Sequence, residues 1–176
     1  VQHHIYYNSP FTDNQPGPAS YWYADSIKAL TIWESASRNG LTVASLFWPV
    51  SVGAKAIRYN IPEFWSVKPV NNQLEYIKPY CTPAGFLDEL EQNATGKLNH
   101  ENFGAGSMNR DARTAAMANY IMNTYKPNLM TIHLITTDYA QHATGLKSDR
   151  VSAAVGGADH AVGLILENLE RNKLLD

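Results

Sequence analysis

LMTIHLI, residues 129–135, is an almost unbroken apolar run of strand length. Such a run is typical of a strand buried on both faces, as in a parallel sheet that is covered by helices. The run leads directly into Thr136, Thr137 and Asp138. Ligands of open α/β sheets bind at the carboxyl ends of the strands, so Asp138 stands where a functional residue is expected.

Helical and strand patterns alternate along the rest of the chain. Apolar spacing, caps and breakers predict a first helix that follows a cap at Asp25 or Ser26 and ends at Asn39-Gly40. Further helices are predicted over residues 82–93, 111–125 and 152–174. A strand is predicted over residues 41–48, and loops over residues 50–81 and 96–107. This order predicts an α/β fold, layered α/β/α with a mainly parallel sheet.

The composition is that of a globular chain without a strong electrostatic field. Of its 176 residues 44% are hydrophobic, which is enough to bury a core. Fourteen Lys and Arg against 16 Asp and Glu leave a net charge of -2, so we expect no binding of duplex nucleic acid or anionic lipid. No apolar run reaches the roughly 20 residues that span a bilayer. The single cysteine, Cys81, leaves the compartment open.

The chemistry of the sequence centres on Asp138-Tyr139-Ala140-Gln141-His142. One turn of helix would bring the carboxylate of Asp138 and the imidazole of His142 to the same side. A carboxylate oxygen and an imidazole nitrogen together suit zinc. Zinc needs three or four ligands and two are visible, so a solvated helix start explains the spacing equally well.

Further motifs follow one another over nearly the whole chain. They are His4-Ile5-Tyr6-Tyr7-Asn8, Thr31-Ile32-Trp33-Glu34 with Ala36, Gly40 and Leu41, Phe47-Trp48-Pro49-Val50-Ser51, Lys126-Pro127-Asn128-Leu129, Asp138-x-x-x-His142-x-x-Gly145 and Ala158-Asp159-x-x-Val162-Gly163. In this order they resemble the nucleotide pyrophosphatase/phosphodiesterase branch of the alkaline phosphatase superfamily. The resemblance implies a partial alkaline-phosphatase-like fold and a metal-dependent phosphodiesterase.

The resemblance also implies roles for individual residues. In the family, two zinc ions activate a threonine or serine nucleophile and clamp the phosphoryl oxygens. Asp138 and His142 would be ligands of one zinc. Asn8 would donate its amide to a phosphoryl oxygen, although composition alone makes it a turn cap. Trp48 and Tyr59 would lie beside the organic group of a small nucleotide or phosphodiester substrate.

By the same resemblance, residues 1–176 form a single incomplete catalytic domain. The nucleophile and the first aspartate ligand would precede Val1, and the remaining ligands would follow Asp176. We therefore expect the chain alone to be inactive, to bind zinc weakly or not at all, and to associate with itself through exposed apolar surface. Since the family usually acts outside the cytoplasm, we also expect an extracytoplasmic location, periplasmic or secreted.

Two departures from the family pattern bear on substrate preference. Val50 stands where the family often has glycine, and Thr136-Thr137 stand where the animal enzymes have Glu-Pro before the metal-binding aspartate. Two alternatives therefore remain beside a phosphodiesterase. One is a phosphomonoesterase or sulfatase of the same superfamily, and the other is a noncatalytic module that binds a sugar or nucleoside through the aromatic residues between Trp48 and Tyr80.

Overall fold

The computed structural model describes residues 3–12, 15–16, 20–66 and 72–175. The chain divides into two compact units. Unit 1 consists of Val1–Leu87 and Pro127–Thr131, and unit 2 consists of Asp88–Lys126 and Ile132–Asp176. The single incomplete domain expected over residues 1–176 stays a prediction.

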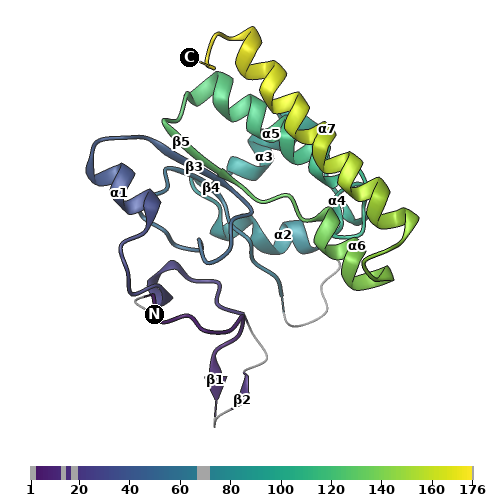
Figure 1. The fold of residues 1–176 in the computed structure, drawn as a ribbon. Coiled ribbons are helices and arrows are strands. Elements are labelled where there is room, and N and C mark those ends of the chain that lie inside the picture. The colour runs from purple at the N-terminus through teal and green to yellow at the C-terminus, as the bar shows by residue number, and fades with distance from the viewer. Residues whose placement is uncertain (1–2, 13–14, 17–19, 67–71, 176) are drawn as a thin grey trace. The chain divides into compact units, whose positions relative to one another are not determined.

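A three-stranded parallel sheet flanked by helices forms the framework and confirms the α/β class (Figure 1). The strands are β3 (Val43–Leu46), β4 (Tyr59–Ile61) and β5 (Leu129–Ile132), in the order β4-β3-β5. β3 and β4 pair in parallel, from Ala44 opposite Tyr59 to Leu46 opposite Ile61. Each of the four residues of β3 is buried, as the centre of a sheet requires.

β5 differs from the expectation for residues 129–135. The strand ends at Ile132, and its four residues are half-buried rather than buried on both faces. Among the described residues β5 lies at an edge of the sheet with β3 as its one neighbouring strand, so it is less enclosed than the central strand β3. The apolar run identified the strand correctly but overestimated its length and burial.

Helix α1 (Ile32–Arg38) begins later than expected. Asp25 and Ser26 belong to a short 3-10 turn, η1 (Ala24–Ser26), so their expected capping role is wrong. A capping box sets the start instead: Thr31 Oγ1 accepts the N–H of Glu34 at 3.2 Å, and Glu34 Oε2 accepts the N–H of Thr31 at 2.9 Å. The N–H and the hydroxyl of Thr31 both donate to the Glu34 carboxylate, and these two hydrogen bonds lower the pKa of Glu34. The expected end is confirmed, with Gly40 at φ +77°.

The stretch from residue 50 to residue 81 is more ordered than expected. It contains β4, helix α2 (Gln73–Ile77) and the 3-10 turn η2 (Lys78–Tyr80). Elements of three to five residues are too short to show a hydrophobic period, which is why the sequence predicted a loop. Two of its aromatic residues pack on Phe64, which stacks on Tyr76 at 5.3 Å between ring centres and meets Tyr80 edge-on at 4.4 Å.

Unit 2 is mainly helical. Its long helices α5 (Arg110–Tyr125) and α7 (Asp149–Arg171) pack on each other, and α6 (Thr136–Thr144) packs on α7 (Figure 1). α5 confirms the helix expected over residues 111–125. α7 starts at Asp149 rather than Ser152, because Ser148 Oγ accepts the N–H of Val151.

The remaining elements are short. They are the strands β1 (Phe11–Thr12) and β2 (Gln15–Pro16), helices α3 (Phe86–Leu90) and α4 (His100–Phe103), and the π-helical turn η3 (Glu91–Thr95). The helix expected over residues 82–93 is thus α3 extended by η3, and the loop expected over residues 96–107 contains α4.

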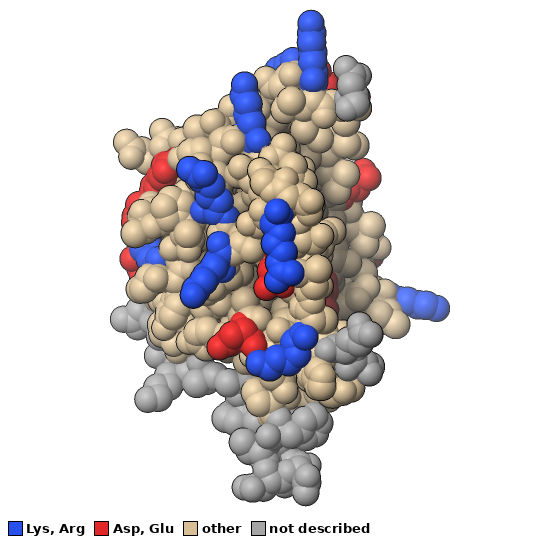
Figure 2. All heavy atoms as spheres, turned by 90° about the vertical axis from the view of Figure 1, so that its left-hand side faces the viewer, with Lys and Arg blue, Asp and Glu red and all other residues tan. Residues whose placement is uncertain are grey.

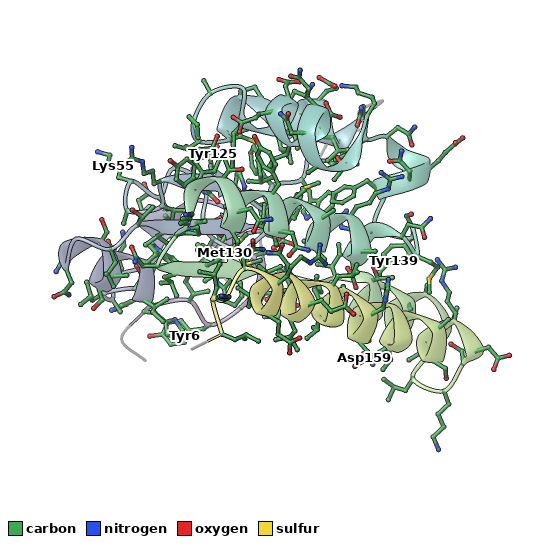
Figure 3. The ribbon with its side chains drawn as sticks, turned by 90° about the horizontal axis from the view of Figure 1, so that it is seen from above. Tyr6, Lys55, Tyr125, Met130, Tyr139 and Asp159 are labelled. Atoms are coloured by element: carbon green, nitrogen blue, oxygen red, sulfur yellow. The ribbon has the colours of Figure 1, made fainter. Side chains whose placement is uncertain are left out.

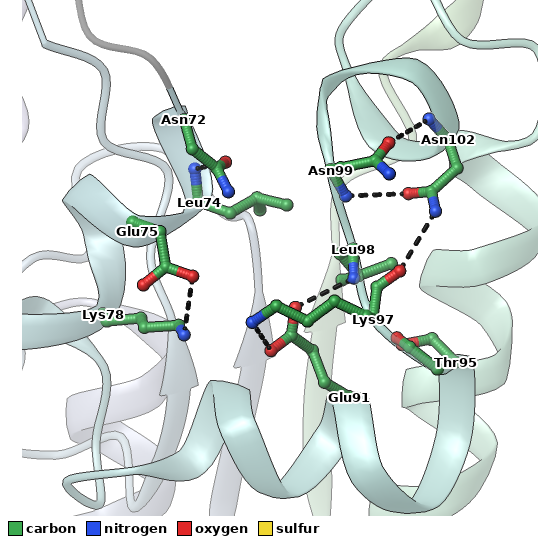
Figure 4. A network of polar contacts seen from close by, with 11 residues as sticks. Asn72, Leu74, Glu75, Lys78, Glu91, Thr95, Lys97, Leu98, Asn99 and Asn102 are labelled. Atoms are coloured by element: carbon green, nitrogen blue, oxygen red, sulfur yellow. Dashed lines mark hydrogen bonds and ion pairs between the residues drawn. The ribbon is translucent and has the colours of Figure 1, made fainter.

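Two polar contacts fix the packing within unit 2. Asn123 of α5 and Asn168 of α7 each donate a side-chain amide hydrogen to the other, at 3.0 and 3.1 Å, and Asn172 donates to the same Asn123 oxygen at 3.1 Å. The buried carboxylate of Glu91, the first residue of η3, accepts hydrogen bonds from the N–H of Leu98 at 2.9 Å and from the ammonium of Lys97 at 2.8 Å (Figure 4). The carboxylate is therefore satisfied although it is buried.

The surface agrees with the weak net charge. Figure 2 shows a face on which Lys and Arg side chains stand out from a largely uncharged surface, with Asp and Glu side chains beside some of them. None of the helices in the described part of the chain combines the length and the apolar character that a membrane crossing requires.

Candidate functional site

Asp138 and His142 lie on one side of α6, as their spacing predicts. Asp138 is in the first turn of the helix and His142 is one turn later. His142 Nε2 lies 3.4 Å from Asp138 Oδ1, and the two side chains are 81% and 72% exposed respectively. The pair therefore presents an oxygen and a nitrogen together to the outside of unit 2.

The separation of this pair matches two ligands of one zinc ion. Ligand atoms about 2.0–2.1 Å from a tetrahedral zinc lie about 3.3–3.4 Å apart. A third ligand is not at hand, since the described residues contain no group of three or more His, Cys, Asp and Glu side chains that could hold a metal. The donor set fits zinc in kind and spacing, and the ligand role of Asp138 and His142 stays a prediction.

Asp111 holds the start of the helix that carries this pair. Its side chain is 1% exposed, and its Oδ1 accepts the N–H of Ile135 at 3.2 Å and that of Thr136 at 3.4 Å. The first N–H groups of a helix have no partner within the helix, and Ile135, at the cap position, has no side-chain acceptor to offer. Asp111 on α5 takes over this capping role from a distance.

No local pattern in the sequence indicates this role of Asp111. Asp111 looks like an acidic residue in the first turn of its own helix, where it would be expected to face water. The one available signal is Ile135, which is a poor cap in front of a helix. A start of this kind requires an acceptor from elsewhere in the chain.

A pocket of about 320 Å³ lies beside α6 in the same unit. Tyr139, next to Asp138 in the chain, forms one wall, and His100, Glu101 and Ser107 supply polar groups. Gly106, which also lines the pocket, lies directly against this side chain: a Cβ on Gly106 would lie 3.0 Å from the Tyr139 ring, which Figure 3 labels. This pocket, which sequence reasoning missed, can take a polar organic group.

Arg150 contacts both Tyr139 and Gly106 of this pocket. Its guanidinium lies 5.9 Å from the centre of the Tyr139 ring, and its Nη2 donates to the carbonyl oxygen of Gly106 at 3.1 Å. The ring and the loop after α4 are therefore held by one side chain from α7.

The other predicted site residues lie in unit 1. Asn8 is exposed, and its carbonyl oxygen accepts the N–H of Tyr21 at 2.9 Å. Trp48, 37% exposed, follows the carboxyl end of β3. Tyr59 begins β4, with its ring 5.7 Å from that of Phe86. Since Tyr59 pairs with Ala44 near the amino end of β3, the structure does not bring Trp48 and Tyr59 together. Their roles stay predictions.

The backbone on both sides of Trp48-Pro49 is strained. Phe47 has φ +54° and Val50 has φ +55°, a region that residues other than glycine adopt at a cost of roughly 1–2 kcal/mol. Ser51 Oγ donates to the carbonyl of Trp48 at 2.7 Å, and Asn60 Nδ2 donates to that of Ser51 at 2.8 Å. Strain held by such bonds is common at functional sites. It also explains why the family often has glycine at the position of Val50.

One comparison with known proteins identifies a family. The family model described as type I phosphodiesterase / nucleotide pyrophosphatase matches residues 1–176. Comparison with curated proteins and with solved structures gives no match.

We expect Val50→Gly to raise the free energy of unfolding by about 0.5 kcal/mol, because the strain it removes exceeds the roughly 0.5–1 kcal/mol of added chain entropy. The matched control is Val52→Gly, at a buried valine without a positive φ, which should lower that free energy by about 2–4 kcal/mol. Urea unfolding followed by circular dichroism measures both. A similar loss of stability in the two variants would contradict the strain at Val50.

We expect Asp111→Ala to lower the free energy of unfolding by about 2–3 kcal/mol, because two buried N–H groups at the start of α6 lose their acceptor. Asp111→Asn keeps one oxygen acceptor and should cost less than half as much. Hydrogen exchange of the amides of Ile135 and Thr136 provides a local measurement, with faster exchange in the alanine variant. Unchanged exchange at these amides would exclude the capping role.

Proposed function

We propose, because this chain belongs to the type I phosphodiesterase/nucleotide pyrophosphatase family, that it supplies two zinc ligands to the active site of a phosphodiester hydrolase. Hydrolysis of small-molecule phosphodiesters is the activity of the family. The observation that carries the proposal is the open pair on α6, with Asp138 Oδ1 and His142 Nε2 at 3.4 Å. This is the spacing of two donors to one ion.

In the proposed site each residue has a separate task. By the family resemblance, Asp138 and His142 would hold one of two zinc ions, and Asn8 would donate its side-chain amide to a phosphoryl oxygen, where negative charge increases during displacement. Bound zinc supplies the Lewis acid that lowers the pKa of the Thr or Ser nucleophile and stabilises the leaving oxygen. Trp48 and Tyr59 offer aromatic faces to the leaving organic group.

Asp111 acts through α6 in this scheme. By fixing the first turn of the helix, its carboxylate sets the direction in which Asp138 and His142 point. Such support around the ligands commonly changes metal affinity by 10–100-fold.

The chain by itself is proposed to be inactive. Its described residues supply two donors where a zinc site needs three or four, and a site with two donors seldom organises around a metal. An extracytoplasmic location, periplasmic or secreted, is part of the same proposal and rests on the family resemblance.

We expect the chain to bind zinc more weakly than about 1 µM and to show no turnover of a phosphodiester. Saturating zinc should still shift the imidazole resonances of His142 in NMR spectra, and Asp138→Asn should reduce that binding by about tenfold. Asp159→Asn with His160→Ala, an exposed acid and imidazole on α7, is the matched control and should leave the binding unchanged. Resonances of His142 that do not respond to zinc would reject the ligand role.

Ester preference separates the phosphodiesterase from its alternatives. In a protein that contains the nucleophile, a diester should be hydrolysed at least about tenfold faster than the matching monoester or sulfate ester. The reverse order would favour the phosphomonoesterase or sulfatase. Binding of a nucleoside without any hydrolysis would favour the noncatalytic module.

Self-association is proposed through α7. Val155, Val162 and Leu166 are 51%, 45% and 45% exposed, and their spacing of seven and four residues places them on one side of the helix. We expect light scattering to show a dimer or larger species at about 100 µM, and Val162→Gln with Leu166→Gln to shift it to the monomer. A monomer at every concentration in the unaltered chain would refute this.

A further inference from the structure

A second pocket, of about 550 Å³, lies in unit 1 at the amino ends of β3 and β4. Its polar lining comes from four places in the chain: Ser37 on α1, Thr42 just before β3, Lys55 and Arg58 on the turn that leads into β4, and Thr82. This is the end of β3 opposite to Trp48, which follows the carboxyl end. The pocket therefore lies away from Trp48, whereas Tyr59 directly follows Arg58, whose guanidinium lies 5.8 Å from the centre of the Tyr59 ring.

The charge of this pocket is positive. Lys55 and Arg58 are both exposed, and the side chain of Lys55 is labelled in Figure 3. No Asp or Glu is among the described residues that line it. From Lys28 to Arg58 the sequence has four basic residues and one acidic residue, Glu34, a net charge of +3 in a chain whose total is -2.

Glu34 and the last carbonyl groups of α1, which lie near this pocket in the sequence, already accept hydrogen bonds. Glu34 accepts hydrogen bonds from Thr31 at the far end of α1. At the carboxyl end of α1, beside the pocket, Asn39 Nδ2 donates to the carbonyl oxygen of Ser35 at 2.8 Å. The backbone N–H of Asn39 donates to the carbonyl oxygen of Ala36, and that of Gly40 to the carbonyl oxygen of Ser37, both at 3.0 Å. The negative end of the α1 dipole is thus partly neutralised where an anion would approach.

We propose that this pocket binds a small soluble anion that carries phosphate groups. The guanidinium of Arg58 offers a planar pair of donors that matches two phosphate oxygens, and the ammonium of Lys55 offers a compact second charge. Hydroxyl groups of Ser37, Thr42 and Thr82 line the same space and can donate to further oxygens. Two cations with no acidic side chain in the lining select an anion of at least two charges.

The turn that carries the two cations is well fixed. Ile57, which is 1% exposed, packs with Trp33 and Val43, and its N–H donates to the carbonyl of Ala54 at 3.1 Å. The N–H of Arg58 donates to the carbonyl of Val43 at 2.9 Å. The backbone of the turn is therefore fixed before the ligand arrives, whereas the exposed side chains of Lys55 and Arg58 become ordered on binding.

Calorimetry with inorganic pyrophosphate tests the proposal. EDTA is included so that no metal at Asp138 and His142 can bridge to the ligand, which keeps the result independent of the proposed catalytic function. We expect one site, weakened about tenfold by Lys55→Gln and by Arg58→Gln, because each loses a charge-assisted hydrogen bond. NMR shifts on addition of pyrophosphate should be confined to residues 37–43 and 55–58 and to Thr82.

The matched control is Lys28→Gln, which removes a lysine of the same unit that donates to the carbonyl of Asp25 and does not line the pocket. It should leave pyrophosphate binding within about twofold. Equal weakening by all three variants would mean a diffuse charge effect and would overturn the proposal. Binding to phosphatidylglycerol vesicles without binding of pyrophosphate would also overturn the proposal, since the site would then recognise a membrane surface.

Discussion

The candidate site depends on one buried carboxylate, that of Asp111. α6 has nine residues and an isoleucine at its cap position, so it cannot satisfy its own first N–H groups. Asp111 accepts two of these N–H groups from a position 24 and 25 residues earlier in the sequence. Burying a carboxylate is unfavourable unless hydrogen bonds compensate for the lost water, and the helix start provides two, both to Oδ1, while Oδ2 has no hydrogen-bond partner among the described residues. The position of Asp138, two residues after Thr136, follows from this contact.

The sequence was most informative where elements are long or end in strong signals. α5 was predicted to within one residue because its apolar period persists over four turns and Lys126-Pro127 stops it. The end of α1 at Asn39-Gly40 was likewise predicted by glycine chemistry. β4 and α2 were not predicted, because elements of three and five residues are too short to display a hydrophobic period. The predicted start of α1 lies too early in the sequence, because Asp25 and Ser26 are plausible caps that compete with the capping box at Thr31.

The candidate site divides in a similar way. The common side of Asp138 and His142 follows from helical spacing, which is local, so the sequence could predict it. The role of Asp111 and the pocket beside Tyr139 depend on contacts between residues far apart in the chain, which no local pattern encodes. Val50 is intermediate: its departure from the family pattern was visible in the sequence, but its physical meaning required the backbone angle of +55°.

The amide pair between Asn123 and Asn168 also limits how unit 2 can move. A slide of α7 along α5 by one helical turn, about 5.4 Å, would break both reciprocal bonds at once and leave the amide of Asn168, 5% exposed, without its partner. Tilting of the helices about this point keeps the bonds intact. The pair therefore disfavours a ratchet of α7 along the axis of α5.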